Sequence, residues 1–200
     1  MKNFWFDYTD VKFEKKLSIA LWMGCTTALR RPELAARVYD VIYVFENVTI
    51  FKNELCCGIP SFYAGDVEGY LKSLQRIIAM IQDKKIKVIV SPCPSCVRAL
   101  RELPKIFNIS LPFKVFHVVE YLWDILSKRN FDLKTNRRIV ATYYDPCGLG
   151  RHLGVFKEPR LIISSINNVE LVEMKKSLNE SRCCGSRGLY LGLIQIELLT

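Results

Sequence analysis

The sequence predicts an α/β protein of two pseudo-symmetric units, each with a small parallel sheet flanked by helices and with cysteines at the carboxyl edge of its strands. One observation is that short apolar runs alternate with helical patterns along the chain. A second is that this pattern starts again, which indicates an internal duplication with a period of about 125 residues. We therefore expect a first unit at residues 1–135 and a second at residues 136–200, incomplete at its C-terminus.

The first unit contains strand and helix patterns in strict alternation. Pro32 suits the first turn of a helix, and Asp66 is a typical N-cap residue for another. The strand-like runs are residues 18–23, 48–51, 87–90 and 114–116, and the helical patterns are residues 32–44, 66–83, 93–103 and 118–128. Alternation of this kind predicts parallel strands joined by helices.

The second unit repeats the beginning of the first. Residues 138–144 match the first strand, residues 159–166 match the helix that starts at Pro32, and residues 169–174 match the second strand. The polar and charged residues 129–137 form the expected junction.

Composition excludes several classes of protein. The chain has 200 residues, of which 50% are hydrophobic and 24% charged, a globular balance. It has no apolar run long enough to span a membrane, and residues 1–16 do not resemble a secretory signal. The formal charge of +9 is dispersed without a basic block, so we expect no nucleic-acid partner and at most peripheral membrane contact. A cytoplasmic location, with association to a membrane only through partner subunits, follows.

Cysteines carry the clearest functional signal. Cys25 is followed after thirty residues by the pair in Cys56-Cys57-Gly58, and Cys147 is followed after thirty-five by the pair in Cys183-Cys184-Gly185. We call Cys25, Cys56, Cys57, Cys93 and Cys96 the first cysteine group, and Cys147, Cys183 and Cys184 the second cysteine group. In a reducing compartment, such spacing favours metal binding or redox chemistry over structural disulfides.

Iron–sulfur ligation is the leading interpretation, because the first cysteine group has five members and a zinc site uses four ligands. Zinc in one half is a minor alternative. A thioredoxin-like dithiol at Cys93 and Cys96 is another, and buried apolar cysteines are a third. The last of these does not explain why the spacing repeats.

The chain resembles the cysteine-rich CCG domain proteins, whose pattern C…C-C-G…C-x-x-C usually occurs twice. The resemblance covers residues 17–188 through W-M-G-C-T, L-C-C-G-I-P, S-P-C-P-S-C, D-P-C-G-L-G-R-H and R-C-C-G. The family includes the B subunit of heterodisulfide reductase and the iron–sulfur subunits of glycolate oxidase, lactate-utilisation and anaerobic glycerol-3-phosphate dehydrogenase systems. The resemblance implies that the first cysteine group binds a noncubane 4Fe-4S cluster.

The second unit departs from the family pattern. Its C-x-x-C partner is expected near position 220, about twenty residues beyond Thr200, by the spacing of the first unit. Either the chain is truncated or another polypeptide supplies that motif. We therefore expect one stable cluster and a second site, at the second cysteine group, that is empty or partly occupied.

Two further residues follow Cys147 in sequence. Arg151 and His152 are candidates for proton donation or for binding an anionic substrate, although a solvated loop explains them equally well. His117, between apolar neighbours, is expected to be structural.

Three functions remain open at this point. The first is an iron–sulfur oxidoreductase subunit that is similar to the B subunit of heterodisulfide reductase and exchanges electrons with a disulfide or similar substrate. The second is an electron-conduit subunit of a flavin-dependent 2-hydroxy-acid or glycerol-3-phosphate dehydrogenase complex. The third is a zinc-stabilised assembly module without redox activity. The expected partners are a ferredoxin-like iron–sulfur subunit, a flavoprotein, or both.

Overall fold

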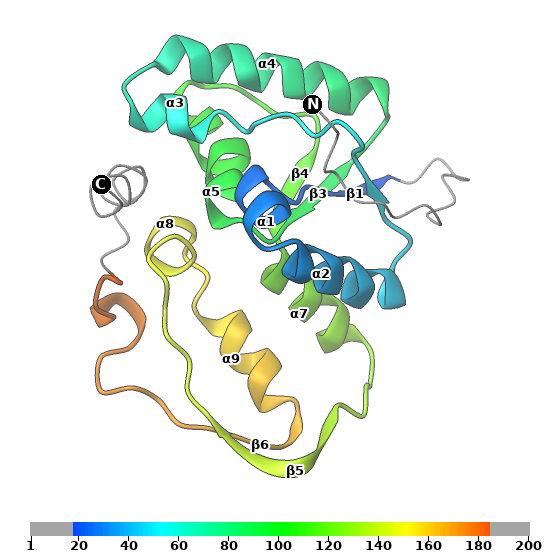
Figure 1. The fold of residues 1–200 in the computed structure, drawn as a ribbon, viewed down its shortest axis with the longest axis vertical. Helices are drawn as coiled ribbons and strands as arrows, with labels where there is room; N and C mark the ends of the chain where they lie inside the picture. The colour runs from blue at the N-terminus through cyan, green and yellow to red at the C-terminus, as the bar shows by residue number, and fades with distance from the viewer. Residues whose placement is uncertain (1–17, 185–200) are drawn as a thin grey trace, which may run out of the picture. The chain divides into compact units, whose positions relative to one another are not determined.

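A computed structural model describes residues 18–184 of the chain. Residues 1–17 and 185–200 lie outside these residues, and with them Gly185 and both ends of the region that resembles the CCG proteins. The chain divides into two compact units, Met1–Phe131 and Asp132–Thr200. Figure 1 shows the helices and strands of each.

The described part of the first unit contains a parallel sheet, as predicted. Its strands are β1 (Ile19–Leu21), β2 (Thr49–Ile50), β3 (Val88–Ser91) and β4 (Lys114–His117), in the order β2-β1-β3-β4. Ala20 pairs with Thr49 on one side and with Ile89 on the other. The chain therefore extends from β1 first to one side and then to the other, and the gap between β1 and β3 is the point where the strand order reverses.

Helices cover both faces of this sheet. They are α1 (Cys25–Arg30), α2 (Pro32–Phe45), α3 (Ile59–Tyr63), α4 (Val67–Asp83), α5 (Pro94–Val97), α6 (Leu103–Ile106) and α7 (Val118–Lys128). Figure 1 shows α4 on one side of the strands and α2 with α7 on the other. A parallel sheet covered in this way is buried on both faces, which explains the uninterrupted apolar runs in its strands.

Packing follows from the alternation of side chains along each strand. Leu21 and Val90 belong to a cluster with Ala35 and Ile42 of α2. On α4, buried residues recur at helical spacing, namely Tyr70, Leu74, Ile77 and Ile81. Trp22 is fully buried, as expected for a core residue. Trp123, on α7, is only half-buried.

The helix predicted over residues 93–103 is present, but its middle is wider than an α-helix. Between α5 and α6, the segment η1 (Arg98–Glu102) forms a π-helical turn in which the Leu103 N–H donates to the Arg98 carbonyl. Pro104 lies in the next turn, has no N–H, and would clash with the carbonyl four residues earlier in a regular α-helix. The wider turn accommodates that ring.

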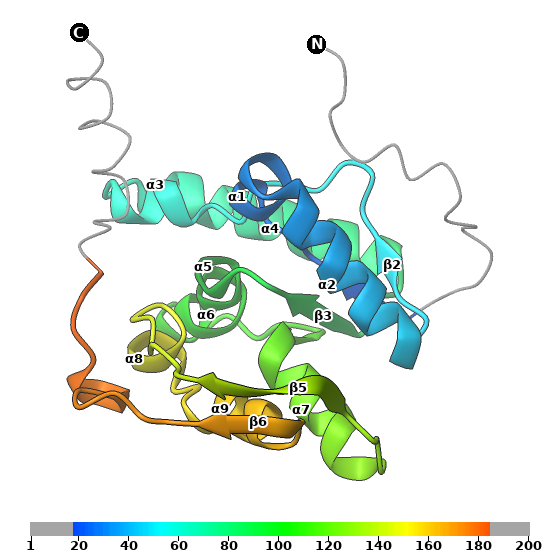
Figure 2. The same ribbon diagram turned by 60° about the horizontal axis from the view of Figure 1, so that its bottom comes forward.

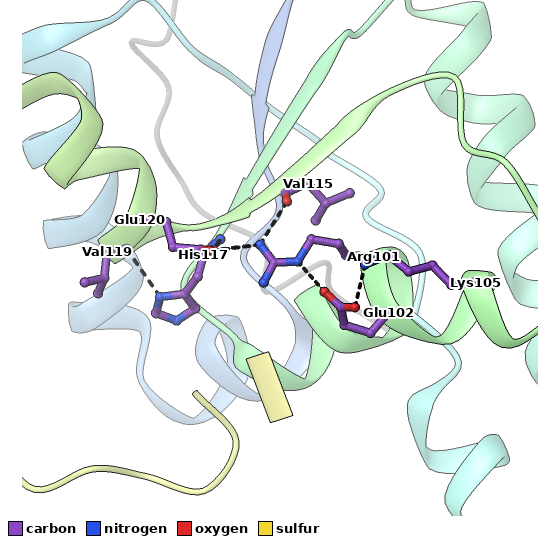
Figure 3. Close-up of polar contacts among 7 residues, drawn as sticks. All are labelled: Arg101, Glu102, Lys105, Val115, His117, Val119 and Glu120. Carbon is purple, nitrogen blue, oxygen red and sulfur yellow. Dashed lines mark hydrogen bonds and ion pairs between the residues drawn. The ribbon is translucent and has the colours of Figure 1, made fainter. Parts of the chain in front are cut away.

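Ionic contacts connect η1 to the start of α7 (Figure 3). The Arg101 guanidinium donates to Glu102 at 2.8 Å and to Glu120 at 2.8 Å. Glu120 also accepts from the backbone N–H of His117 at 2.8 Å, which closes a capping box at the start of α7. The third and fourth strands of the unit are thereby connected through their following helices.

The second unit has the same element order as the start of the first. Its strands β5 (Lys134–Ala141) and β6 (Asn167–Leu171) are parallel, and between them lie α8 (Gly150–Leu153) and α9 (Lys157–Ser164). A 3₁₀ turn, η2 (Leu178–Glu180), follows. Figure 2 shows β5 beside β6 with α9 alongside them.

Several boundaries predicted in this unit are wrong. The strand β5 begins at Lys134 rather than at residue 138 and ends at Ala141 rather than at residue 144, and β6 covers residues 167–171 rather than 169–174. Residues 134–137 of the expected junction are therefore strand, with exposed charged side chains, and Lys134 pairs with Asn167 of β6 ahead of an irregularity in register. The helix α9 begins at Lys157, which places Pro159 in its first turn.

Among residues 18–184, no helix is both long enough and apolar enough to cross a membrane.

Candidate metal centre

The first cysteine group lies on three loops at one edge of the first sheet. Cys25 opens α1 after β1, Cys56 and Cys57 precede α3 after β2, and Cys93 and Cys96 flank the start of α5 after β3. The three strands are parallel, so these loops leave the same edge. Because β1 and β3 flank the reversal of strand order, the loops meet where parallel folds place their sites.

Thiols of all three loops affect one another's pKa values. The Cys56 thiol shifts the pKa of Cys25, and the Cys56 and Cys96 thiols shift the pKa of Cys57. The Cys96 thiol also shifts the pKa of Cys93. These effects connect the five sulfurs in one continuous chain of pairs, although no three of the described Cys, His, Asp or Glu side chains surround the position of a single metal ion.

Exposure changes along this chain of sulfurs. Cys57 and Cys96 are buried, Cys93 is half-buried, and Cys25 and Cys56 are exposed. The inner thiols therefore face protein, and the outer two face solvent. None of the eight cysteines forms a disulfide in this structure.

Shared protons shift the thiol pKa values in opposite directions. Hydrogen bonds from Cys56 and Cys96 lower the pKa of Cys57 to about 4. A hydrogen bond from Cys96 lowers the pKa of Cys93 to about 7, and the same contacts raise the pKa of Cys96 well above its usual value. The hydrogen bond to Cys56, followed by burial, raises the pKa of Cys25. Full ionisation of the group therefore needs a compensating positive charge.

Gly24 brings the first loop against the third. Its backbone φ of +76° lies in the region that favours glycine, and a Cβ there would lie 2.9 Å from the Cys96 Sγ and 3.2 Å from the Cys93 Cβ. Any side chain at this position would displace the sulfurs. The sequence motif W-M-G-C-T contains this glycine, but only the structure shows what it faces.

Gly58 lies between Cys57 and the start of α3. In the structure it has a φ of +78°, and a Cβ there would lie 3.0 Å from the Ser73 Cβ and 3.2 Å from Tyr70. The close neighbour is therefore helix α4. The glycine lets the chain turn from Cys57 into α3 while α3 packs on α4.

Glu54 is a site residue that sequence reasoning missed. Its carboxylate accepts the backbone N–H groups of Met23 and Gly24, both at 2.7 Å. Burial raises its pKa to about 7, against these two hydrogen bonds, which lower it. The only sequence signal is an acidic residue two positions before Cys56, which is too weak to distinguish it from a surface glutamate.

His117 is structural, as expected. It is 5% exposed, its Nδ1 accepts from the Val119 N–H, and its Nε2 lies 3.1 Å from the carbonyl oxygen of Pro92. Burial lowers its pKa to about 4, so the ring is neutral at pH 7 and carries its proton on Nε2. The ring therefore anchors the loop immediately before Cys93.

The second cysteine group lies on two loops of the second unit. Cys147 is half-buried between β5 and α8, and Cys183 with Cys184 follows η2 and is exposed. The pKa of Tyr144 is raised by desolvation and then by the charges of Cys184, Cys183 and Cys147. That these three thiols approach one another stays a prediction.

Polar contacts join these two loops. The Tyr144 hydroxyl donates to the Arg182 carbonyl, and the Arg151 guanidinium donates to the Ser181 carbonyl at 2.8 Å. The guanidinium of Arg151 is therefore engaged with backbone oxygens. His152 lies beside it on α8 with an exposed side chain.

Asp145, directly before Pro146 and Cys147, is the second residue that sequence reasoning missed. It is 2% exposed, and its two oxygens accept from Arg160 at 2.7 Å each. One of them also accepts from the Leu178 N–H at 2.7 Å. The bidentate contact with Arg160 lowers the pKa of Asp145 and ties α9 to both cysteine loops of this unit.

This arrangement defines a class of protein built of small α/β units, in which one cysteine follows the first parallel strand and a Cys-Cys pair follows the second. Residues 19–101 and 141–198 match the family described as CCG, the cysteine-rich domain. The chain belongs to that family.

Several relatives of known description are similar to most of the chain. The D subunit of dihydromethanophenazine:CoB–CoM heterodisulfide reductase from Methanosarcina barkeri is 35% identical over 90% of this chain and 45% of its own length. Lactate utilization protein A from Bacillus subtilis is 28% identical over 87% of this chain and 74% of its length. The B subunit of fumarate reductase (CoM/CoB) from Methanothermobacter marburgensis is 30% identical over 85% of this chain and 33% of its own length. The chain thus spans less than half the length of the heterodisulfide reductase relative.

Proposed function

We propose that this chain is an iron–sulfur subunit of an oxidoreductase of the heterodisulfide reductase type, and that the first cysteine group holds a noncubane 4Fe-4S cluster. The observation that carries this proposal is the convergence of five thiols from three loops at the switch point of the sheet. The relatives that are subunits of redox enzymes support it.

The donor set fits such a group. Thiolates are the ligands of iron–sulfur clusters, and five of them exceed the four positions of a tetrahedral zinc site. The adjacent pair Cys56-Cys57 places two sulfurs on one loop, which suits a group of several metal atoms better than one ion. When bound, the cluster would supply one-electron steps and an iron centre able to interact with substrate sulfur.

The chain's own residues would hold, orient and shield that group. The buried sulfurs of Cys57 and Cys96 would keep water from its inner side, whereas the exposed Cys25 and Cys56 leave an outer side open to a substrate or partner. Electrons would pass to or from a disulfide or similar substrate on that open side. The disulfide gains two electrons and two protons in forming two thiols, and the electrons come from a partner subunit.

A second candidate is an electron conduit in a flavin-dependent dehydrogenase complex, with chemistry on the partner. The similarity to lactate utilization protein A favours it. The expected partners are a ferredoxin-like iron–sulfur subunit or a flavoprotein, in the cytoplasm or associated with a membrane through those partners. A zinc-stabilised module without redox activity is the third candidate, and no described residues beyond the thiols favour it.

Anaerobic purification with iron, sulfide and zinc analysis tests the assignment. We expect iron and sulfide in equal amounts, a brown protein with absorbance at about 400 nm, and negligible zinc. Replacing Cys57 by Ser should remove this iron, whereas replacing Cys183 should leave it, since Cys183 belongs to the second group. Zinc in place of iron would contradict the proposal. Disulfide reduction by the loaded chain with a chemical reductant would favour the first candidate over the conduit.

A further inference from the structure

We propose that Glu54 is a positioning residue of the cysteine site, which sets where the loop carrying Cys25 lies relative to the other two cysteine loops. It is not a ligand in this assignment. Its consequence for iron binding rests on the function proposed above, whereas its consequence for the exposure of the thiols does not.

Glu54 connects two loops that are thirty residues apart in sequence. It lies two residues before Cys56, and its two carboxylate oxygens accept separately from the N–H groups of Met23 and Gly24, each at 2.7 Å. One side chain thus makes two short, charge-assisted hydrogen bonds to consecutive residues of the Cys25 loop. Two bonds to consecutive residues fix the orientation of that backbone as well as its distance.

Neither the sheet nor helix α1 supplies a hydrogen-bond acceptor for these two N–H groups. The N–H of Trp22 donates to the Val90 carbonyl at 2.8 Å and extends the contact between β1 and β3. The helix α1 begins at Cys25, and Ala28 donates to the Gly24 carbonyl at 2.9 Å. Met23 and Gly24 lie between the sheet and the helix and are both buried, so their donors need an acceptor from elsewhere. Glu54 supplies it.

The loop that Glu54 holds rests directly on the third cysteine loop. A Cβ on Gly24 would lie 2.9 Å from the Cys96 Sγ, so the backbone of the first loop covers that sulfur. Cys96 is only 3% exposed. The position of Gly24 therefore decides both where Cys25 is presented and how well Cys96 is covered.

The negative charge of Glu54 does not by itself favour a position beside cysteine thiolates. A carboxylate near thiolates is repelled by them and opposes their ionisation. The contribution of Glu54 is therefore the position of the backbone, which a neutral side chain of similar shape would reproduce only in part. An amide at residue 54 keeps one acceptor but turns an N–H donor toward the other backbone N–H.

Alkylation of the metal-free protein tests this role without requiring iron. We expect Glu54→Ala to expose Cys96, so that iodoacetamide modifies it about tenfold faster than in the unmodified protein, because the covering loop opens locally. Glu54→Gln should give a smaller increase. Mass spectrometry of the peptide containing Cys96 measures the rate, and circular dichroism establishes that each variant is folded.

Asp66→Ala is the matched control. Asp66 also accepts a backbone N–H through its carboxylate, from Gly69 at 2.8 Å at the start of α4, but touches no cysteine loop. It should weaken the fold without changing Cys96 alkylation. Equal rates in the unmodified protein and Glu54→Gln, or an equal increase in Asp66→Ala, would overturn the positioning role. If Glu54→Ala does not fold, Glu54→Gln decides alone.

Iron analysis separates this proposal from the preceding one. If the unmodified chain takes up iron and sulfide, Glu54→Ala should retain less than half of the iron and show an altered electron paramagnetic resonance spectrum. The iron content and spectrum of Asp66→Ala should match those of the unmodified chain. If the unmodified chain takes up none, the proposed function fails, and the alkylation rates still decide the role of Glu54.

Discussion

His117 shows how one buried side chain can tie a cysteine loop to the scaffold. Its Nδ1 accepts the Val119 N–H at the start of α7, and its Nε2–H donates to the Pro92 carbonyl just before Cys93. The bond from Val119 requires the neutral ring, because a protonated Nδ1 cannot accept a hydrogen bond. Burial, with a smaller contribution from Arg101, lowers its pKa from 6.5 to about 4 despite the hydrogen bond to Pro92.

His117→Asn should therefore change the pH dependence of stability. The unfolded chain protonates this ring near pH 6.5 and the folded chain only near pH 4, so its contribution is complete above about pH 6.5 and is lost as the pH falls toward 4. The asparagine keeps a capping oxygen and does not titrate. We expect the unmodified protein to lose up to about 3 kcal/mol of unfolding free energy relative to the variant across this window, so that the variant becomes the more stable of the two near pH 4.

Urea unfolding of both proteins at several pH values measures this difference. Groups that titrate in both proteins, Glu54 among them, cancel in the comparison. A difference that stays constant between pH 7 and 4.5 would contradict the lowered pKa, because it would mean that the ring titrates alike in the folded and unfolded chains. At pH 7 the variant should lose about 1 kcal/mol, the typical contribution of one hydrogen bond.

At the scale of elements, the two glycines of positive φ near α3 allow a controlled comparison. Gly58 and Gly65 both have φ near +80°, at +78° and +86°. A Cβ on Gly58 would press on Ser73 of α4, whereas a Cβ on Gly65 would meet nothing within 4 Å. Backbone strain is thus common to both positions, and close packing applies only to the first.

We expect Gly65→Ala to destabilise the protein by about 1 kcal/mol through strain alone. Gly58→Ala should cost about 1–3 kcal/mol more, because α3 must move away from α4. The same shift should reduce iron uptake, since Cys57 directly precedes this glycine. Equal unfolding free energies for the two variants would mean that the contact with α4 relaxes without cost.

In the second unit, the ion pair of Asp145 and Arg160 is expected to be the main support of the Cys147 loop. Asp145→Asn removes the charge while keeping the shape, and leaves Arg160, whose side chain is 15% exposed, with Glu173 as its remaining carboxylate partner. We expect a loss of about 2 kcal/mol in unfolding free energy, below the range for a buried charge left wholly unpaired. Glu170→Gln is the matched control, because its pair with Arg138 is exposed and should contribute less than about 1 kcal/mol. Similar losses for both variants would contradict this ranking.

For the whole molecule, the two units share one order of elements, with a cysteine after the first strand and a pair after the second. The described part of the second unit ends at Cys184, before any counterpart of β3 and of the C-x-x-C loop. Three thiols would leave metal atoms open to water and oxygen, so metal held there should be labile.

Iron counting on the 200-residue chain tests this expectation. After anaerobic reconstitution and removal of unbound metal, we expect about four irons per chain, all at the first cysteine group. About eight would show that the second cysteine group suffices for a cluster. Adding a C-x-x-C segment, on the same chain or on a partner, should then raise the count from about four to about eight.

Local patterns in the sequence were enough to predict the parallel α/β class. They also predicted that the cysteine loops meet at the carboxyl edge of the strands. The alternation of apolar runs, Asp66 as the cap of α4 and the extent of α7 depend on near neighbours, and the structure reproduces them. The charged strand β5 was misplaced because its partner β6, rather than its own hydrophobicity, determines where it begins.

The sequence by itself determined which residues are chemically able to bind metal, because cysteine type and spacing are local properties. Only the tertiary structure decided that Glu54 holds the backbone of Met23 and Gly24, that Gly24 covers Cys96, and that Asp145 is buried against Arg160. Each of these contacts joins residues distant in sequence or brings the loops of separate strands together. No local pattern encodes them, since they exist only once parallel strands place their carboxyl ends side by side.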